Sequence, residues 1–404
     1  MLNFSLTSVW FIALLIISPI ILNNNWKVRK YIYFAICLSV YILTMNFSGT
    51  YSFAGPLLAF AAWVIIPYLY VKIFPRLPKF PIIIAIVCAF IWMNQYFLQY
   101  LPGLGKIFLP FRLLGLSYIL FKQIDFILIN TDSQAISKRK FYDFVDYVNY
   151  LISFWTVLAG PIQRFDQFVK DFYEERAELS GSLILKSLHR AANGFIKVVV
   201  LAPFFSSHAV DLLDLSFGSV GQPALRPLYF ILYCILNAVY IYLDFSGYCD
   251  VVISFSSLSG FTVPENFDKP YLARNMQEFW NRWHITLSTW IRDFLYQPMF
   301  KKLISGIFSS RIEFAQYISL FITFLLAGIW HGTDFNYVVY GVLQGAGVIL
   351  STLYVKLLKK KMGNKKYKIF SQKKKVIWAE RVVCMLYVSI SFGFVGNDII
   401  GRIF

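Results

Sequence analysis

Long apolar stretches separated by short polar segments run through most of this chain. A membrane-crossing helix needs about 20 predominantly apolar residues. The stretches that meet this length with few or no charged residues are 4–22, 31–47, 54–71, 81–100, 227–243, 313–330, 335–355 and 377–397. Weaker candidates, each short or carrying charge, are 107–130, 144–160, 183–206 and 248–262. The pattern predicts an all-α polytopic membrane protein with about 8–12 membrane helices, some of them broken or re-entrant.

The composition agrees with a membrane protein. Apolar residues make up 58% of the chain and charged residues 15%, against about 25% charged residues in an average soluble domain. No internal repeat or long linker divides the chain, so we predict one integral membrane domain over residues 1–404. Within it we distinguish N-terminal spans (1–130), a motif-bearing core (131–345), and a Lys-rich loop with the last span (346–404). The first apolar run has no basic leader, and we expect it to be retained as a span.

Positive charge is concentrated near the C-terminus. The net charge is +17, and ten lysines with no acidic residue lie between Lys356 and Lys375, so +7 remains without them. Short basic loops also follow the first, third and fifth candidate spans, whereas the loops between them are uncharged. This alternation predicts that the basic loops are cytoplasmic and that the N-terminus lies outside. We expect no nucleic-acid partner, because most of the excess charge belongs to one loop.

Cysteine and histidine are too sparse for a metal or disulfide framework. The five cysteines are scattered, and most lie inside apolar runs, so we expect neither a bound metal nor a set of disulfides. Four histidines are present. His189 and His208 lie in unremarkable surroundings and are interpreted as structural, which leaves His284 and His331 as candidates for histidine chemistry.

A first polar cluster extends over residues 244–300. Apolar and aromatic side chains recur in it at helical spacing and predict one stripe on a helix: Trp280, Trp283, Leu287, Trp290 and Phe294. Arg282, His284 and Arg292 lie off that stripe. One interpretation is an amphipathic interfacial helix with Trp anchors and snorkelling arginines. The other is a functional site, because ionisable residues inside a membrane are usually functional.

Helix-breaking residues lie within the first cluster. Gly260, Pro264 and Pro270 interrupt regular helix there. Irregular backbone at membrane depth is tolerated only where protein or a water-filled cavity surrounds it. The interruptions therefore favour a buried or cavity-lining position for this segment.

A second polar cluster, residues 327–345, contains His331. This histidine follows Trp330 and lies between Gly328 and Gly332, and we expect the glycines to let backbone or substrate approach the imidazole closely. A histidine can act as a general base near neutral pH when its surroundings keep it unprotonated. A lone membrane histidine can also be a hydrogen-bonding residue between helices, and this alternative stays open.

Both clusters resemble motifs of the membrane-bound O-acyltransferase family. The stretch PENFDKPYLARNMQEFWNRWHITLSTWIRDFLYQPMF is followed by GIWHG, and the earlier LAGPIQRFDQF and LDFSGYCD are similar to blocks of the bacterial branch of that family. That branch includes alginate O-acetylases and the membrane proteins of teichoic-acid D-alanylation. The resemblance implies an all-helical membrane domain around a central funnel. It assigns the catalytic role to His331 and the family's second motif histidine to His284.

The chain departs from the family pattern at one position. Relatives often carry a histidine three residues after a Trp-Gly pair, where this chain has Gln344 after Tyr340 and Gly341. The function of that histidine in relatives therefore does not transfer to this chain.

The resemblance implies an O-acyltransferase of the bacterial cytoplasmic membrane. We predict transfer of an acyl group, with acetyl favoured, from a cytoplasmic thioester (acyl-CoA or an acyl carrier) to a hydroxyl of an extracytoplasmic cell-envelope polysaccharide. No bound cofactor is expected, and an extracytoplasmic partner protein and membrane lipid are the other expected partners. Asn281, Arg282 and Trp330 are candidate oxyanion donors. The full set of candidate substrate-binding residues is Asn281, Arg282, Arg292, Trp330, Asp293 and Asp244.

Three other functions stay open on the sequence. The first is D-alanyl transfer to teichoic acid, which the short length and the single span after the basic tract favour. The second is a lipid or polymer transporter, which would also show broken helices and buried charge but should carry an inverted repeat; none is visible in the sequence. The third is an inactive scaffold for a partner acyltransferase.

Overall fold

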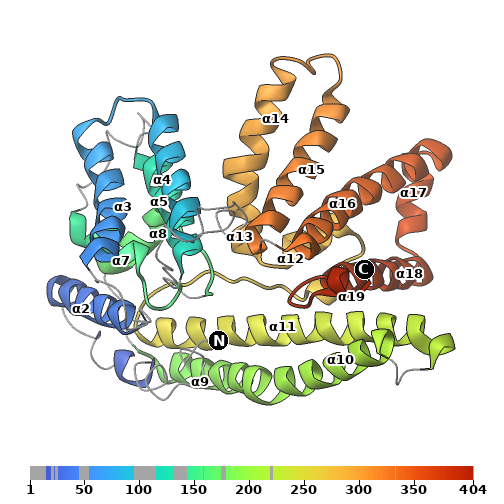
Figure 1. Ribbon diagram of the computed structural model, residues 1–404, viewed down its shortest axis with the longest axis horizontal. Coiled ribbons are helices and arrows are strands. Elements are labelled where there is room, and N and C mark those ends of the chain that lie inside the picture. The colour runs from blue at the N-terminus through green and yellow to red at the C-terminus, as the bar shows by residue number, and fades with distance from the viewer. Residues whose placement is uncertain are drawn as a thin grey trace. The chain divides into compact units, whose positions relative to one another are not determined.

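The computed structural model describes residues 15–19, 22, 26–44, 54–94, 115–130, 143–157, 159–173, 179–218, 222–332 and 334–403. Most of these residues are in helices (Figure 1). In this part of the chain, β geometry is confined to one isolated bridge between Phe267 and Trp283. The predicted all-α fold class is confirmed.

The described chain divides into two compact units. Unit 1 comprises Met1–Phe195 with Tyr248–Pro264, and unit 2 comprises Ile196–Gly247 with Glu265–Phe404. Whether the chain folds as the single domain expected from the sequence stays a prediction.

Unit 1 is built on an aromatic core. Its helices are α2 (Trp26–Thr44), α3 (Ala54–Ile73), α4 (Lys79–Asn94), α5 (Leu116–Asn130), α7 (Phe144–Leu151), α8 (Phe165–Tyr173), α9 (Gly181–Phe195) and the C-terminal end of α11 (Arg226–Leu258). Helices α3, α4 and α5 lie side by side (Figure 1). Tyr147 on α7 is fully buried against Phe126 on α5, with ring centroids 4.4 Å apart.

Unit 1 also buries charged side chains with their partners. The carboxylate of Asp125 on α5 accepts hydrogen bonds from the Tyr150 hydroxyl (2.9 Å), the Arg164 guanidinium (3.0 Å) and the backbone N–H of Phe165 (2.8 Å). A buried charge is tolerated when it is paired and hydrogen-bonded. This network attaches the start of α8 to α5.

The predicted span over 144–160 is wrong. Helix α7 begins with a capping box, in which Asp143 and Asp146 satisfy each other's backbone N–H groups, and it ends at Leu151. Non-helical backbone follows from Ser153 up to α8 in the described part of this segment. The buried polar residues between α7 and α8, including Ser153 and Thr156, form hydrogen bonds within unit 1. This segment therefore belongs to the core of unit 1 and does not form a membrane-crossing helix.

Unit 2 contains the C-terminal helices. They are η2 (Ile196–Leu201), α10 (Ala202–Phe217), η3 (Pro223–Leu225), α11 as far as Gly247, η4 (Pro270–Leu272), α12 (Met276–Arg282), α13 (Ile285–Ile291), η5 (Arg292–Tyr296), α14 (Gln297–Ile304), α15 (Ile312–His331), α16 (Phe335–Met362), α17 (Asn364–Ser371), α18 (Lys374–Phe392) and α19 (Ile399–Ile403). Elements η2 and η5 are π-helical turns.

Among the described residues, four helices are long and apolar enough to cross a membrane: Gly181–Phe217, Pro223–Leu258, Ile312–His331 and Phe335–Met362. Two separate spans were expected at 227–243 and 248–262, but α11 continues through both, so that expectation is wrong. No proline interrupts the polar residues between them, and the helix continues to Leu258, just before Gly260, whose φ of 74° is left-handed. Most of the expected span at 4–22 lies outside the described residues.

Candidate active site

The predicted continuous helix through the first polar cluster is broken at His284. Helix α12 ends at Arg282, Trp283 is extended, His284 has φ 45° and ψ 51°, and α13 starts at Ile285. A left-handed residue other than glycine costs free energy and is found where surrounding contacts hold it in place. The expectation of one helical stripe is therefore wrong, because the break turns His284 inward, where it is 5% exposed.

Asn266 supplies the contacts that hold this break. Its backbone C=O accepts a hydrogen bond from the Ile285 N–H (3.0 Å). Its side-chain Oδ1 accepts hydrogen bonds from the Thr286 N–H (3.2 Å) and the Thr286 hydroxyl (2.8 Å). The same Oδ1 lies 3.1 Å from Nδ1 of His284. One asparagine thus fixes both the backbone after His284 and the imidazole.

This arrangement sets the tautomer of His284. A backbone N–H can only donate, so the Asn266 atom that it contacts must be the amide oxygen, an acceptor. Nδ1 of His284 therefore carries a proton and donates it to Asn266, which leaves Nε2 with a free lone pair. Burial, and next the proximity of His331, lower the pKa of His284 to about 3, so the imidazole is neutral at physiological pH.

His331 is the last residue of α15, where α15 and α16 form a tight hairpin (Figure 1). A Cβ on Gly328 would come within 2.5 Å of the Tyr337 backbone oxygen and 2.7 Å of the Gly341 Cα, and one on Gly332 would come within 2.2 Å of the Tyr337 ring. Of the backbone or substrate that we expected the glycines to admit, it is the backbone of α16 that approaches Gly328 closely, and the Tyr337 ring approaches Gly332. These glycines allow close helix packing, which holds His331 in position.

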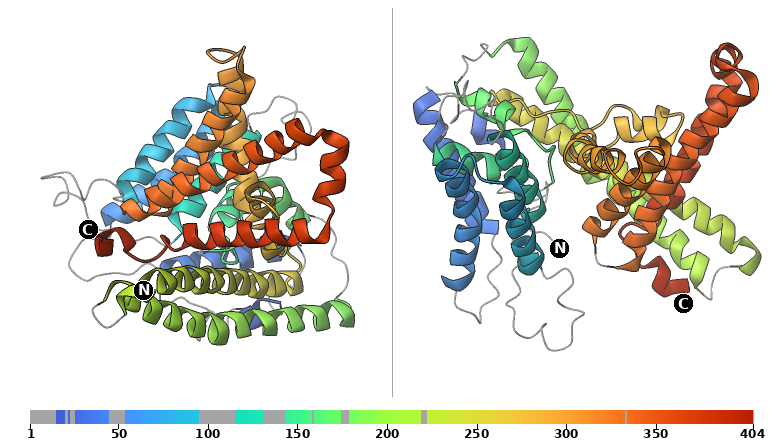
Figure 2. Two further views of the ribbon diagram at one scale, coloured as in Figure 1. Left: turned by 90° about the vertical axis from the view of Figure 1, so that its right-hand side faces the viewer. Right: turned by 90° about the horizontal axis from the view of Figure 1, so that it is seen from above.

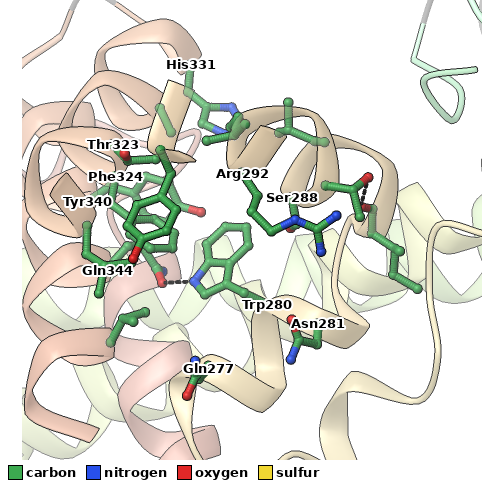
Figure 3. Close-up of a pocket in the computed structure, with 18 of the residues that line it drawn as sticks. Gln277, Trp280, Asn281, Ser288, Arg292, Thr323, Phe324, His331, Tyr340 and Gln344 are labelled. Carbon is green, nitrogen blue, oxygen red and sulfur yellow. Dashed lines mark hydrogen bonds between the residues drawn. The ribbon is translucent and has the colours of Figure 1, made fainter. Parts of the chain in front are cut away.

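Two cavities in unit 2 meet at His331. The larger, about 350 Å³, is lined by residues of α12 to η5 and of α15 and α16 (Figure 3). The smaller, about 90 Å³, includes both His284 and His331 in its lining. Residues that line both cavities are Trp280, Leu287, His331 and Tyr340. His331 is exposed, in contrast to the buried His284.

Trp280 is held between the two cavities by a hydrogen-bonded chain. Its indole N–H donates to the Gln344 side-chain oxygen (3.1 Å; Figure 3). The Gln344 amide donates to the Ser391 hydroxyl (2.7 Å). Ser391 in turn donates to the backbone oxygen of Val388 (2.8 Å). Gln344, the position at which this chain departs from the family pattern, therefore orients an aromatic side chain of the cavity wall.

The structure places two of the six predicted substrate-binding residues in the same cavity as His331. Asn281 and Arg292 line the larger cavity with it. Arg292 begins the π-helical turn η5, and its Nε donates to Asp293 (2.9 Å). Single π-helical turns occur frequently at functional sites.

The remaining candidates lie outside the lining of both cavities. Arg282 forms ion pairs with Glu278 (3.0 Å) and Asp268 (3.2 Å). Trp330 contacts His331, with ring centroids 4.6 Å apart, and Asp293 contacts Arg292. Asp244 is exposed on α11 and is not brought to His331. The described residues contain no group of three or more His, Cys, Asp or Glu side chains that could hold a metal ion.

Sequence reasoning missed Asn266, Trp280 and Tyr340 as site residues. Asn266 lies in the PENF motif, which carried the family resemblance without being assigned a role. Trp280 was assigned to an apolar stripe, and nothing in the local sequence distinguished it from Trp283, which is buried in a cluster with Phe279 and Phe392.

Much of the chain is similar to known proteins. The model of the MBOAT, membrane-bound O-acyltransferase, family matches residues 82–390. The probable alginate O-acetylase AlgI of Pseudomonas putida is 33% identical over 232 residues, covering 57% of this chain and 44% of that protein. The teichoic acid D-alanyltransferase of Streptococcus thermophilus is 30% identical over 255 residues, covering 62% of this chain and 59% of that protein.

A third relative acts on another polymer. The peptidoglycan O-acetyltransferase of Helicobacter pylori is 30% identical over 229 residues, covering 56% of this chain and 40% of that protein. The chain thus spans less than two thirds of the length of each of these relatives. Because the family model covers most of the chain, including both histidine motifs and the two cavities, the chain belongs to the membrane-bound O-acyltransferase family.

Proposed function

We propose that this protein transfers an acyl group from a thioester donor to a hydroxyl acceptor at His331. The observation that carries the proposal is the position of His331, which lines both cavities of unit 2. A substrate group in either cavity would therefore lie beside the same side chain. Membership of the membrane-bound O-acyltransferase family supports this reaction class.

In the proposed reaction His331 acts as a general base. A ring nitrogen takes the proton of the acceptor hydroxyl, and the hydroxyl oxygen attacks the thioester carbonyl. The tetrahedral intermediate then collapses, the carbon–sulfur bond breaks, and the leaving thiolate takes the proton from the imidazolium. General base catalysis of this kind contributes about 10²- to 10⁴-fold in rate. Holding both substrates beside His331 would raise the rate further, because the reacting groups are already positioned.

Two polar side chains of the larger cavity suit the donor. Asn281 offers an amide N–H to the oxyanion that develops. Arg292 suits the phosphate carried by a pantetheine-borne donor, because guanidinium–phosphate hydrogen bonds are charge-assisted. We therefore assign the larger cavity to the donor thioester.

The acceptor is proposed to be a cell-envelope polysaccharide, with acetyl as the transferred group. Two of the relatives described above are named as O-acetylating enzymes of polysaccharides, and one as a D-alanyltransferase of teichoic acid. D-alanyl transfer remains the second candidate because that relative covers the largest share of this chain among the three. The proposed location is the bacterial cytoplasmic membrane, with the acceptor delivered from outside, directly or through an extracytoplasmic partner protein.

Replacing His331 tests the proposed reaction. Purified protein in proteoliposomes is given radiolabelled acetyl-CoA, acetyl-carrier or D-alanyl-carrier together with polysaccharide or teichoic acid acceptors. His331→Ala should lower the transfer rate by about 10²- to 10⁴-fold while leaving membrane insertion unchanged. His208→Ala is the matched control, because His208 is exposed on α10 and lines neither cavity. Full transfer activity in a correctly inserted His331→Ala variant would contradict the assignment.

The same preparation separates the rival functions. If the protein is a transporter, the unmodified protein transfers no acyl group. Its His331→Ala variant still moves intact lipid or polymer across the proteoliposome membrane. A scaffold would leave polymer modification in cells unchanged when His331 is replaced. His284→Ala is expected to reduce both activity and thermal stability, because the buried imidazole contacts Phe245 (4.7 Å between ring centroids) and Asn266.

A further inference from the structure

A third cavity lies in unit 2, away from both histidines. It measures about 630 Å³ and is lined by residues of α16, α17 and α18 and of the segment from Arg274 to Glu278. Figure 2 shows α17 joining the ends of α16 and α18. Its volume falls within the range of about 300–1,000 Å³ that is typical of small-molecule sites. The acyl-transfer reaction proposed above does not use it.

The charged groups in the wall of this cavity are already paired within the protein. The Arg274 guanidinium donates to Glu380 (2.7 Å) and to the backbone oxygen of Ser371 (2.6 Å). Glu278 accepts from the Arg274 N–H (3.0 Å) and forms an ion pair with Arg282 (3.0 Å). What remains of the lining is mainly apolar and aromatic, with Leu350, Phe370, Val376 and Val383 among its residues. The cavity therefore suits an apolar occupant.

The chain segment that supplies Tyr367, Phe370 and Ser371 to the cavity wall is strongly basic. The ten lysines between Lys356 and Lys375 are unaccompanied by any acidic residue. Lys356 is paired with Glu313, whereas Lys366 and Lys368 of α17 are exposed and directly flank the lining residue Tyr367 in the sequence. An apolar cavity next to a cationic segment is complementary to an amphipathic anion.

The outer surface of the surrounding helices indicates that this anion comes from the membrane. Leu357 on α16 is 63% exposed, and Trp378 and Val382 on α18 are 65% and 52% exposed. Exposed aliphatic side chains with a Trp near a Lys-rich helix end are typical of the membrane interface. The lysines place this end of the helices on the cytoplasmic side, where anionic phospholipids give the leaflet its negative potential.

We propose that this cavity is a binding site for one anionic phospholipid of the cytoplasmic leaflet. An acyl chain occupies the space between α16 and α18, and the phosphate lies against the lysines of α17. Basic pockets between membrane helices on the cytoplasmic side are suited to lipid head groups. The proposal goes beyond the acyl-transfer function and does not depend on it.

Native mass spectrometry of the delipidated full-length protein tests the site. The protein is titrated with phosphatidylglycerol, with phosphatidylcholine of identical acyl chains, and with inorganic phosphate. Phosphatidylglycerol should bind with one site that is tighter than the rest, and phosphatidylcholine should not fill it. Each lysine near an anionic head group contributes about fivefold in affinity, so the double variant Lys366→Gln/Lys368→Gln should weaken that site by about 25-fold.

A second variant tests the cavity itself with the lysines intact. Ala379 lines the cavity, so Ala379→Trp should fill it and abolish the tight site. Val382→Trp is its matched control, because Val382 is exposed on the same helix and outside the lining. Lys301→Gln/Lys302→Gln is the matched control for charge, as an exposed lysine pair on α14 outside the lining. Both controls should bind phosphatidylglycerol as the unmodified protein does.

Several outcomes would overturn the proposal. Equal binding of the two lipids, or a tight site that survives Ala379→Trp, would show ordinary lipid contact with the helix surface. Saturable binding of inorganic phosphate that displaces phosphatidylglycerol would show a free-phosphate site. An acidic carrier protein that binds through Lys366 and Lys368 and is unaffected by Ala379→Trp would show that the lysines form a protein-docking surface.

Discussion

Arg282 and Arg292 flank α13, but their surroundings differ. Arg282 forms ion pairs with Glu278 on the same helix, α12, and with Asp268 in the segment before that helix. Arg292 lines the larger cavity, and its side chain is 55% exposed. On the sequence, both are candidate substrate-binding residues. The structure favours this role for Arg292 and a structural role for Arg282.

Neutralising Arg292 should therefore affect the donor selectively. Because the side chain is exposed, its interaction with a phosphate is worth about 1 kcal/mol or less, so Arg292→Gln should raise the donor KM by about two- to fivefold at low salt. The difference should shrink at physiological ionic strength, where the charges are screened. Steady-state kinetics with donor and acceptor varied separately measure it.

Arg282→Gln serves as the comparison for that experiment. It should lower the Tm and kcat together, because it loosens the break that positions His284, without a selective change in donor KM. An effect of Arg292→Gln confined to the acceptor KM would refute the donor assignment of the larger cavity.

At the scale of elements, the α15–α16 hairpin determines where His331 lies. A Cβ on Gly341 would come within 2.8 Å of the Phe324 backbone oxygen and 3.2 Å of the Gly328 Cα. Small residues at such crossings let membrane helices approach closely and gain van der Waals contact. The two glycines therefore act as a pair, one on each helix, just before and after the turn that carries His331.

Gly341→Ala should separate the two helices at this crossing. The added methyl group meets backbone atoms, which cannot move aside independently, so we expect a loss of about 1–3 kcal/mol in stability and a lower kcat from displaced His331. Thermal unfolding in detergent and the acyl-transfer assay report the two effects. Gly181→Ala is the control, because a Cβ there meets nothing within 4 Å. An unchanged Tm and kcat for Gly341→Ala would show that the crossing tolerates a side chain.

At the scale of the whole molecule, charge predicts the orientation of the chain in the membrane. Lys301 and Lys302 lie on α14, and the ten-lysine tract follows α16. Helices α15 and α16 cross in opposite directions between these two basic regions. Both regions should therefore lie on the same, cytoplasmic side, with the Asp334 turn toward the outer half.

Cysteine labelling tests this orientation. Cys88 is the one exposed native cysteine, so a Cys88→Ser background leaves only buried thiols. Ser309→Cys and Gln372→Cys, both exposed positions, should react with a membrane-impermeant maleimide only after the cells are permeabilised. Asp334→Cys should react without permeabilisation. Reaction of Gln372→Cys in intact cells would reverse the predicted topology and remove the cytoplasmic assignment of the lipid site.

The sequence by itself determined the fold class and the family, and it predicted the histidine of the proposed reaction. Hydrophobic runs report directly on helices that must satisfy their backbone groups internally, and the runs that end at His331 and begin after Asp334 are helices in the structure. The family motifs are local in sequence, so His284 and His331 could be identified without knowing how they pack.

Only the tertiary structure decided how these residues are arranged. The break at His284 depends on Asn266, which is distant along the sequence and close in space, so the spacing of apolar residues could not show it. The pairing of Trp280 with Gln344 and the exclusion of Arg282 from the cavity likewise depend on which helices meet. Hydropathy measures the average preference of a segment for an apolar surrounding, whereas cavities, ion pairs and left-handed residues arise from contacts between segments.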